Sequence, residues 1–134
     1  MSRAGALLFI IVTILTLSSC TAAPGGDASG AVQALQGYLT ALVDKDEAKL
    51  TSLTCPDFET DALLEYDSFQ AVKTQLAGLT CQPAGSENGD VLVNCQGKIL
   101  ASYTNEAQEF DLSSRVYRMT KSGADWQVCG YTVK

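Results

Sequence analysis

The first regular hydrophobic pattern after residue 30 has the period of a helix. In AVQALQGYLTALVD, residues 31–44, apolar residues stand three and four positions apart, which predicts an amphipathic helix. Asp46 can cap a second, shorter helix over 47–53, which ends before a Cys-Pro step. The acidic stretch 57–67 has a looser pattern, and Ser68 then has the character of an N-cap for a third helix. The apolar face of that helix would comprise Phe69, Val72, Leu76 and Leu79.

After the third predicted helix the hydrophobic period falls to two, as in a strand. Four antiparallel strands are expected in a meander, over 79–86, 90–103, 108–120 and 125–133. Asn88-Gly89 between the first two is typical of a hairpin turn. Pro83 restricts the first strand to an edge, and Gly97 indicates a β-bulge in the second. These patterns predict an α+β domain over residues 30–134, with two to three N-terminal helices packed on a curved antiparallel four-strand meander.

Residues 1–19 have the composition of a signal peptide. Arg3 provides a small positive end, and the uncharged run ALLFIIVTILTL follows over 6–17. This run is shorter than the roughly 20 apolar residues that a membrane-spanning helix needs. Residues 20–29 are rich in Ala, Gly and Ser and lack apolar periodicity, which predicts a flexible tether.

The chain has five cysteines, an odd number that needs an explanation in an exported protein. Setting Cys20 aside leaves an even set of four, suited to an oxidising compartment. Cys81 and Cys95 stand seven residues on either side of the predicted turn, so a hairpin would place them opposite each other. Cys55 would then pair with Cys129, although four cysteines allow three pairings. Neither a Cys-x-x-Cys spacing nor a histidine occurs in the sequence, so no metal site is expected.

The charge of the chain argues against one class of partner. The full sequence has 9 basic and 15 acidic residues, a net charge of −6. Loss of residues 1–19 would remove Arg3 and no acidic residue, which leaves 8 basic against 15 acidic residues, or −7. Nucleic acid repels a domain of this charge without a basic run, so nucleic-acid binding is not expected.

The sequence Leu17-Ser18-Ser19-Cys20 is similar to the lipobox of bacterial lipoproteins, in which an aliphatic residue and two small residues precede a cysteine. The resemblance implies cleavage before Cys20, acylation of its sulfur and new amino group, and anchoring in the bilayer on the extracytoplasmic side of the cell membrane, or in an outer membrane where there is one. Two or three acyl chains anchor stably, whereas one is marginal. The alternatives are an ordinary signal peptide that leaves Cys20 as a spare thiol, and a short signal anchor.

Two further segments carry a second resemblance. YLTALVDKDEAKLTSL (38–53) has an Asp-Lys-Asp step between two helices, and ADWQVCGY (124–131) closes the last strand. Together with the meander they resemble the NTF2-like superfamily over residues 30–134, and more narrowly its small lipoproteins that end in Trp-x-Val-Cys-Gly. The resemblance implies a cystatin-like cone in which the sheet wraps the helices. Enzymes of the superfamily use an Asp-His or a Tyr-Asp pair, but this chain has no histidine, so we expect no catalytic residues and no cofactor.

These inferences predict a non-enzymatic, lipid-anchored binding module. A cone offers a cavity for a small apolar ligand, with Tyr103, Tyr117 and Trp126 as candidate contacts, and the open sheet face offers a site for a protein partner. Tyr103, Tyr117 and Tyr131 fall one per strand and could line the cone, but cross-strand packing explains them equally well, and burial in the core explains Trp126. The alternatives are therefore an interaction lipoprotein with a filled core and, less favoured, an enzyme without histidine.

Two charged groups of residues are interpreted as solvated surface. Asp111, Arg115 and Arg118 fall along one predicted strand, where a buried Asp111–Arg115 pair at a pocket would be of functional interest. The carboxylates of 57–67 could supply oxygen ligands to Ca²⁺, but they lack the spacing of an EF-hand loop.

Overall fold

The computed structural model describes residues 25–134, which form an α+β domain with helices followed by an antiparallel sheet. The helices of this range are α1 (Gly25–Asp44), α2 (Glu47–Ser52) and α3 (Glu59–Ser68). Its strands are β1 (Lys73–Glu87), β2 (Asp90–Tyr103), β3 (Glu106–Asp111), β4 (Arg115–Ser122) and β5 (Asp125–Val133). The expected signal peptide, residues 1–19, and the expected lipidation site, Cys20, lie outside the described residues.

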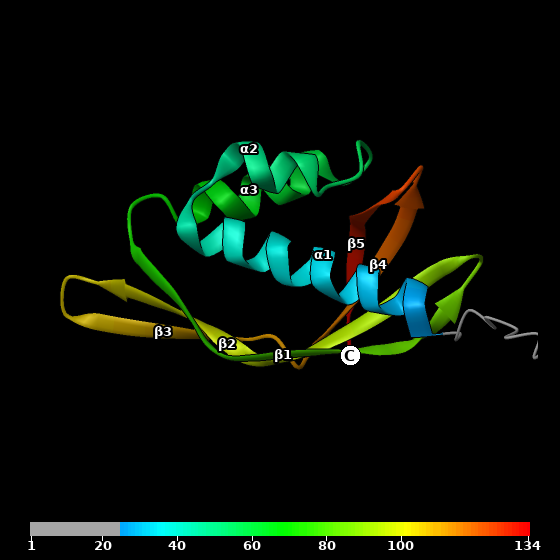
Figure 1. Ribbon diagram of the computed structural model, residues 1–134. Coiled ribbons are helices and arrows are strands. Elements are labelled where there is room, and N and C mark those ends of the chain that lie inside the picture. Colours follow the sequence, from blue (N-terminus) through cyan, green and yellow to red (C-terminus); the bar gives the residue numbers. More distant parts are fainter. Residues whose placement is uncertain (1–24) are drawn as a thin grey trace, which may run out of the picture.

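The helices lie together on one side of a bent sheet (Figure 1). The strand order is β1-β2-β4-β5, and β3 also pairs with β2. Residues 98–103 of β2 pair with β3, and residues 91–94 pair with β4, so β3 and β4 follow one another along the same edge of β2. The sheet therefore has two wings that are joined by the long β1–β2 hairpin, and α1 crosses the concave side between them (Figure 1).

A bulge in this hairpin lets the sheet bend. Between Ala77 and Thr80, β1 has one residue more than the facing part of β2, and Gly78 in this interval has a φ of 65°. Gly97 of β2 has a φ of 104°, and a Cβ atom there would lie 2.6 Å from the carbonyl oxygen of Ala77. The irregularity that the sequence predicted at Gly97 is therefore present, with the extra residue on β1.

The third helix that the sequence predicted, from Ser68 to Leu79, is wrong. Ser68 is the last residue of α3, and β1 begins at Lys73, six residues before the first strand was expected. The bulge explains the error. It turns both Leu76 and Leu79 towards the core although they stand three positions apart, which is a helical spacing.

The acidic stretch 57–67, for which the sequence predicted no element, contains most of α3. Ala62 and Tyr66 stand one turn apart and are buried, and Phe58 and Phe69 are buried at the two ends of the helix. Each turn of α3 thus presents a narrow apolar face among many carboxylates. A face this narrow gives only a weak periodic pattern in the sequence.

The strand predicted over 108–120 is interrupted. Asp111 Oδ1 accepts a hydrogen bond from the backbone N–H of Ser113 (2.8 Å), and the Ser114 hydroxyl donates to the Asp111 carbonyl (3.1 Å). This Asx turn ends β3 and lets β4 start at Arg115. Residues 25–134 therefore contain five strands where the sequence predicted four, while the predicted α+β class is confirmed.

The β1–β2 hairpin has the turn that the sequence predicted. Asn88 and Gly89 form it with φ values of 51° and 88°, the left-handed region that a two-residue hairpin turn requires. Cys81 and Cys95 lie opposite each other in the register and form a disulfide, with their Cα atoms 4.0 Å apart. The turn and the disulfide fix the register of the longest pair of strands in the described domain.

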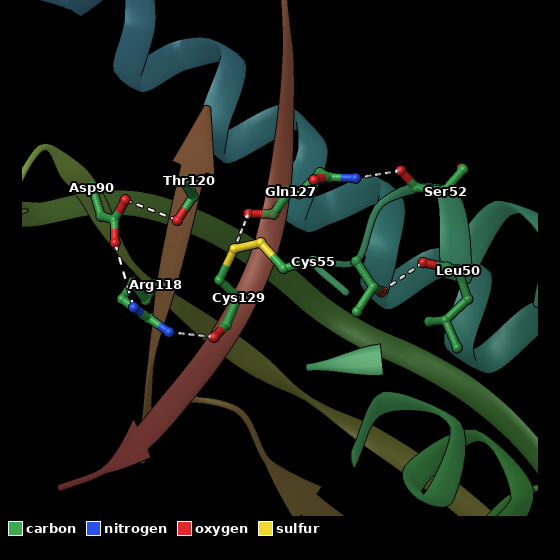
Figure 2. Close-up of a disulfide and its surroundings, with 9 residues drawn as sticks. Leu50, Ser52, Cys55, Asp90, Arg118, Thr120, Gln127 and Cys129 are labelled. Atoms are coloured by element: carbon green, nitrogen blue, oxygen red, sulfur yellow. Dashed lines mark hydrogen bonds and ion pairs between the residues drawn. A yellow bond between two sulfur atoms is a disulfide. The ribbon is translucent and has the colours of Figure 1, made fainter. Parts of the chain in front are cut away.

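A second disulfide, Cys55–Cys129, fastens the helical layer to β5, with Cα atoms 4.9 Å apart (Figure 2). Beside it the Cys55 N–H donates to the Val128 carbonyl (2.9 Å), and the Val128 N–H donates to the Leu53 carbonyl (2.8 Å). The segment after α2 therefore covers an edge of the sheet that would otherwise be open. Both disulfides join the pairs that the sequence favoured.

α1 provides most of the helical contribution to the core. Its inward side chains are almost completely buried and are those of Ala31, Leu35, Tyr38, Leu39 and Leu42. At Gly30 the helix lies so close to Trp126 that a Cβ atom would be 2.9 Å from the indole ring. The helix begins at Gly25, so residues 25–29, which were predicted to be flexible tether, belong to it.

Removal of the two disulfides one at a time is expected to have unequal effects. The Cys55–Cys129 bond joins residues 74 apart in the sequence, and the Cys81–Cys95 bond joins residues 14 apart. In the chain-entropy model, loss of the first lowers the free energy of unfolding by about 4.5 kcal/mol and loss of the second by about 3 kcal/mol. Urea unfolding of the two Cys→Ala double variants measures this difference. A larger loss for the hairpin bond would contradict the loop-length explanation.

Candidate functional site

The three residues that the sequence predicted as ligand contacts do not lie together. Tyr117 is fully buried, and Trp126 is 9% exposed where it packs against α1. Tyr103, at the end of β2, is 46% exposed. Tyr117 pairs with Val93 in the register, so about ten residues of β2, roughly 33 Å of extended strand, separate it from Tyr103. The three side chains therefore lie in different parts of the domain.

A different set of polar and aromatic side chains meets between the helices and the β4–β5 pair. The guanidinium Nη1 of Arg115 lies 2.7 Å from Glu65 Oε1 on α3, and it also donates to the Tyr117 hydroxyl at 3.3 Å. Arg115 Cζ lies 4.4 Å from the centre of the Tyr131 ring, in cation–π geometry. We call Tyr38, Glu65, Arg115, Tyr117 and Tyr131 the tyrosine–arginine cluster.

The backbone of the two strands explains why these side chains meet. Arg115 and Tyr117 stand two positions apart on β4, so their side chains point to the same, helical side of the sheet. Tyr131 of β5 lies opposite Tyr117 in the register, with the two ring centres 5.4 Å apart. Phe58, immediately before α3, packs edge-on against Tyr131 at 6.1 Å. The cluster thus has an aromatic wall on β4 and β5 and a carboxylate above it on α3.

The ion pair of the cluster is largely withdrawn from water. The side chains of Arg115 and Glu65 are 17% and 15% exposed, whereas those of the Lys98–Glu109 pair, at the same 2.7 Å, are 44% and 57% exposed. Within the described residues, all hydrogen bonds of the guanidinium come from Nη1. The N–H groups of Nη2 and Nε therefore remain available as donors.

Tyr38 contributes a hydroxyl without a partner. The side chain is fully buried, and among the buried side-chain polar atoms of residues 25–134 only this oxygen lacks a hydrogen bond. Glu65 and Tyr117 are close enough to affect its ionisation. A buried polar group without a partner costs about 1–3 kcal/mol, so native structures rarely contain one unless a water molecule or a ligand atom completes it.

Burial keeps the phenols of the cluster neutral. Desolvation raises the pKa of Tyr117 to about 12, against the opposing effect of nearby Arg115. Desolvation, with a further contribution from Glu65, raises the pKa of Tyr38 far above its ordinary value. Burial alone would lower the pKa of Arg115, but Tyr117 and Glu65 outweigh it and raise that pKa. At neutral pH the cluster therefore presents a charged arginine and two phenols that can donate hydrogen bonds.

The hypothetical Asp111–Arg115 pair does not form. The carboxylate of Asp111 is exposed and is used in the Asx turn, where hydrogen bonds from Ser113 hold its pKa below the ordinary value. Arg115 comes after that turn and pairs with Glu65 instead. The pair was considered because one continuous strand was predicted through Ser113. The Asx turn interrupts that strand between Asp111 and Arg115.

Arg118 stands between Tyr117 and Met119 on β4, so its side chain leaves the opposite face of that strand from Tyr117. Figure 2 shows it beside the Cys55–Cys129 disulfide. Its Nη2 donates to the Cys129 carbonyl at 2.7 Å, and its Nη1 lies 3.6 Å from a carboxylate oxygen of Asp90. A register shift at Gly130, whose φ is 135°, takes this carbonyl out of the regular ladder. The Cys-Gly step of the last strand thus allows one side chain to bridge two strands beside the disulfide.

Sequence reasoning missed two members of the cluster. Glu65 is one carboxylate among several in 57–67, and Tyr38 occupies an ordinary apolar position of α1. One feature of the sequence did single out Glu65 among these carboxylates. Glu65 stands three positions after the buried Ala62, so the two side chains are neighbours on one face of the helix and an acidic side chain lies beside a buried one.

In the range 25–134 no three His, Cys, Asp or Glu side chains gather in a way that could hold a metal ion, and this includes the carboxylates of 57–67. None of the described helices combines the length and the apolar character that crossing a membrane requires.

Comparison with known proteins gives a similarity of fold. No family model matches the chain, and no curated protein matches its sequence. The structure is similar to the solution structure of a SEC-C motif containing protein from Rhodopseudomonas palustris, with a TM-score of 0.53 and 11% identity over 80% of each chain. It is also similar to Bd1075 of Bdellovibrio bacteriovorus, with a TM-score of 0.48 and 10% identity over 75% of this chain and 37% of that one. The first similarity concerns the fold alone.

The buried ion pair is expected to stabilise the fold more than the exposed one. Glu65→Gln leaves the charge of Arg115 without a partner in a poorly hydrated site, so the free energy of unfolding should fall by about 2–3 kcal/mol. Glu109→Gln removes the partner of Lys98 at the same distance but in water, and should cost less than about 1 kcal/mol. Urea unfolding of both variants measures the difference. Equal losses would mean that Glu65 does not pair with Arg115 in solution.

Proposed function

We propose that this chain is an extracytoplasmic lipoprotein whose domain is a non-enzymatic binding module. Acylated Cys20 would hold the domain at the membrane, and the tyrosine–arginine cluster would bind a small, mainly apolar ligand on the concave side of the sheet. The observation that carries the binding proposal is the buried hydroxyl of Tyr38, which lacks a partner among the described residues.

The pairing of the other cysteines supports the anchor. With Cys55–Cys129 and Cys81–Cys95 in disulfides, Cys20 is the one remaining cysteine of five. Disulfides of this kind persist in oxidising compartments, where an unmodified spare thiol is a liability. A lipobox-like sequence that ends at this cysteine accounts for it, because acylation consumes the thiol.

The arrangement of the helices supports an NTF2-like cone. α1 crosses the concave side of the antiparallel sheet, and the two wings rise on either side of it (Figure 1). In the superfamily that the sequence resembles, the interior of the cone is where ligands are taken up. The tyrosine–arginine cluster lies between α1, α3 and the β4–β5 pair, and we assign the ligand to this space by analogy with that superfamily.

The chemistry of the cluster suits a ligand with an apolar body and one polar oxygen. The rings of Tyr117, Tyr131 and Phe58 would contact the apolar part. The Tyr38 hydroxyl and the unused N–H groups of Arg115 would donate to a carbonyl or carboxylate oxygen. Arg115 and its carboxylate partner keep part of their surface in water, so the ligand would enter beside them.

The same groups are poorly suited to acid–base catalysis. An efficient catalytic acid or base has a pKa near the working pH. The pKa values of Tyr38 and Tyr117 are raised above their ordinary values by burial, and the chain has no histidine. Binding without a chemical step is therefore the function we propose.

The lipid anchor is tested by Cys20→Ser in the full-length chain. The variant should lose incorporation of radiolabelled palmitate and should appear as a soluble product or an uncleaved precursor, because the acylated sulfur is gone. Membrane fractionation and labelling in cells measure both effects. The Cys81→Ala/Cys95→Ala variant loses two cysteines but keeps Cys20, and should stay labelled and membrane-bound. Unchanged membrane retention and labelling of the Cys20 variant would rule out the anchor.

The ligand is tested by native mass spectrometry of the protein extracted from its own membrane in mild detergent. A discrete mass beyond the chain, its acyl groups and two disulfides is expected, and it should be lost on denaturation. Tyr38→Phe should lower the occupancy about three- to tenfold, because it removes one hydrogen-bond donor from the site. Tyr103→Phe, which removes an exposed hydroxyl at the far end of β2, should leave the occupancy unchanged.

A filled core gives the opposite result in the same experiment. The wild-type protein would then show no extra mass, and Tyr38→Phe would raise the free energy of unfolding by about 1 kcal/mol or more, because a buried hydroxyl without a partner is removed. That pair of observations would replace the ligand-binding proposal with an interaction lipoprotein whose interior is closed.

A further inference from the structure

The free edge of β1 has a short regular segment at its beginning. β1 pairs with β2 and with no other described strand, so one side of its backbone has no strand neighbour. Over residues 73–77 the pairing is regular, and beyond them the bulge at Gly78 and then Pro83 and Gly85 disturb the edge. Bulges and proline discourage the addition of a further strand. Residues 73–77 are therefore the part of this edge that can accept one.

Two open hollows adjoin this segment, and both are lined by Lys45, Lys73 and Ser102. One, of about 530 Å³, follows the first residues of β1 and reaches the neighbouring strand. The other, of about 510 Å³, lies between the α3–β1 connection and Tyr103. Together they flank the beginning of β1 and leave its surroundings accessible.

The hollows are positively charged in a chain that is acidic as a whole. Lys45 Nζ donates to the carbonyls of Gln70 (3.2 Å) and Val72 (2.7 Å), which fixes its ammonium group beside β1 and leaves one N–H unused. Lys73 is exposed, and its ammonium makes no hydrogen bond or ion pair within residues 25–134. No carboxylate is among the residues that line either hollow.

The acidic residues on either side of Lys45 do not change this charge. Asp46 is turned towards α2, where its side chain accepts the Lys49 backbone N–H at 3.0 Å as the N-cap. Asp44 is exposed at the end of α1 and lines neither hollow. The beginning of β1 is thus a local exception to the net charge of −6 of the whole chain.

We propose that an extended, acidic segment of a partner protein pairs with β1 at residues 73–77, with its carboxylates beside Lys45 and Lys73. In strand addition, main-chain hydrogen bonds supply the affinity, and flanking side chains supply the preference for a sequence. Here the two ammonium groups select carboxylates. A second copy of this chain is a poorer occupant, because its own residues 73–77, Lys-Thr-Gln-Leu-Ala, offer no carboxylate to the two ammonium groups.

The position of the hollows suits a partner that approaches from outside the membrane. α1 spans the 20 residues Gly25–Asp44, which is about 30 Å, and Lys45 follows directly at its end. An anchor attached before Gly25 would therefore leave the β1 edge at the end of the domain away from the bilayer. This orientation rests on the proposed anchor, whereas the pairing at the edge does not.

The test uses the full chain in detergent micelles and a fluorescein-labelled, capped octapeptide of alternating Glu and Val. Fluorescence anisotropy should show saturable binding that weakens as the salt concentration rises. Lys73→Gln should weaken it about fivefold, which is the most that one solvent-exposed ion pair contributes. Lys121→Gln makes the same charge change at an exposed position of β4, in the other wing of the sheet, and should leave the binding within about twofold.

Two further peptides separate strand addition from simple attraction between charges. N-methylation of every second residue removes the N–H donors of one peptide edge without changing its charge, and it should abolish binding. The matching Lys-Val peptide should not bind. Equal binding of the N-methylated peptide, or equally effective competition by inorganic phosphate, would identify a site for anions and overturn the proposal.

Two other results would also overturn the proposal that an acidic partner strand pairs with β1. One is the absence of binding by the Glu-Val peptide to the wild-type chain. The other is a dimer in analytical ultracentrifugation that Lys73→Gln alters, which would assign the edge to a second copy. Neither result bears on the ligand proposed for the tyrosine–arginine cluster, which native mass spectrometry examines separately.

Discussion

The sheet bends along a line where successive strands lose their regular pairing at the same level. The bulge at Gly78 in β1 lies across from Gly97 in β2, and the Leu112 N–H, in the gap between β3 and β4, donates to the Gly97 carbonyl at 3.0 Å. A side chain at residue 97 would collide with the backbone of β1, so glycine is needed for the bend. Because the bend lies there, the two wings can close around α1. The core, the tyrosine–arginine cluster and the open edge of β1 all take their positions from it.

α3 is attached to the rest of the domain by a few specific bonds as well as by its narrow apolar face. The disulfide of Cys55 holds the segment before it, and the Glu65–Arg115 ion pair holds its middle. The Tyr66 hydroxyl donates to the carbonyl of Lys45 at 3.1 Å, which links the helix to the end of α1. Directional bonds of this kind fix the orientation of a short helix, where apolar burial alone would fix only its distance from the core. The helix thereby places its carboxylate above the aromatic wall.

The parts of this fold that were predictable from the sequence are those that local chemistry determines. The spacing of apolar residues in α1, the N-cap Asp46 and the Asn-Gly hairpin turn each act over a few neighbouring positions. The bulge that places Leu76 and Leu79 on one side, and the Asx turn that splits a predicted strand, depend on neighbouring strands. The candidate site was the least predictable part. Glu65 and Arg115 are 50 positions apart, and of the three predicted ligand contacts only Tyr117 belongs to the cluster.

The Cys55–Cys129 bond also determines what a single break in the main chain does to the molecule. The covalent loop that it closes contains α3 and β1 to β4 entirely, and the hairpin disulfide lies inside that loop. The turns at 88–89 and 104–105 are exposed and lie within it, so a peptidase that cuts once at either turn leaves two fragments that remain joined. The strands on both sides of such a cut keep their partners in the sheet. Damage of this kind yields a nicked but assembled domain: Cys55–Cys129 joins the fragments after a cut at 104–105, and both disulfides join them after a cut at 88–89.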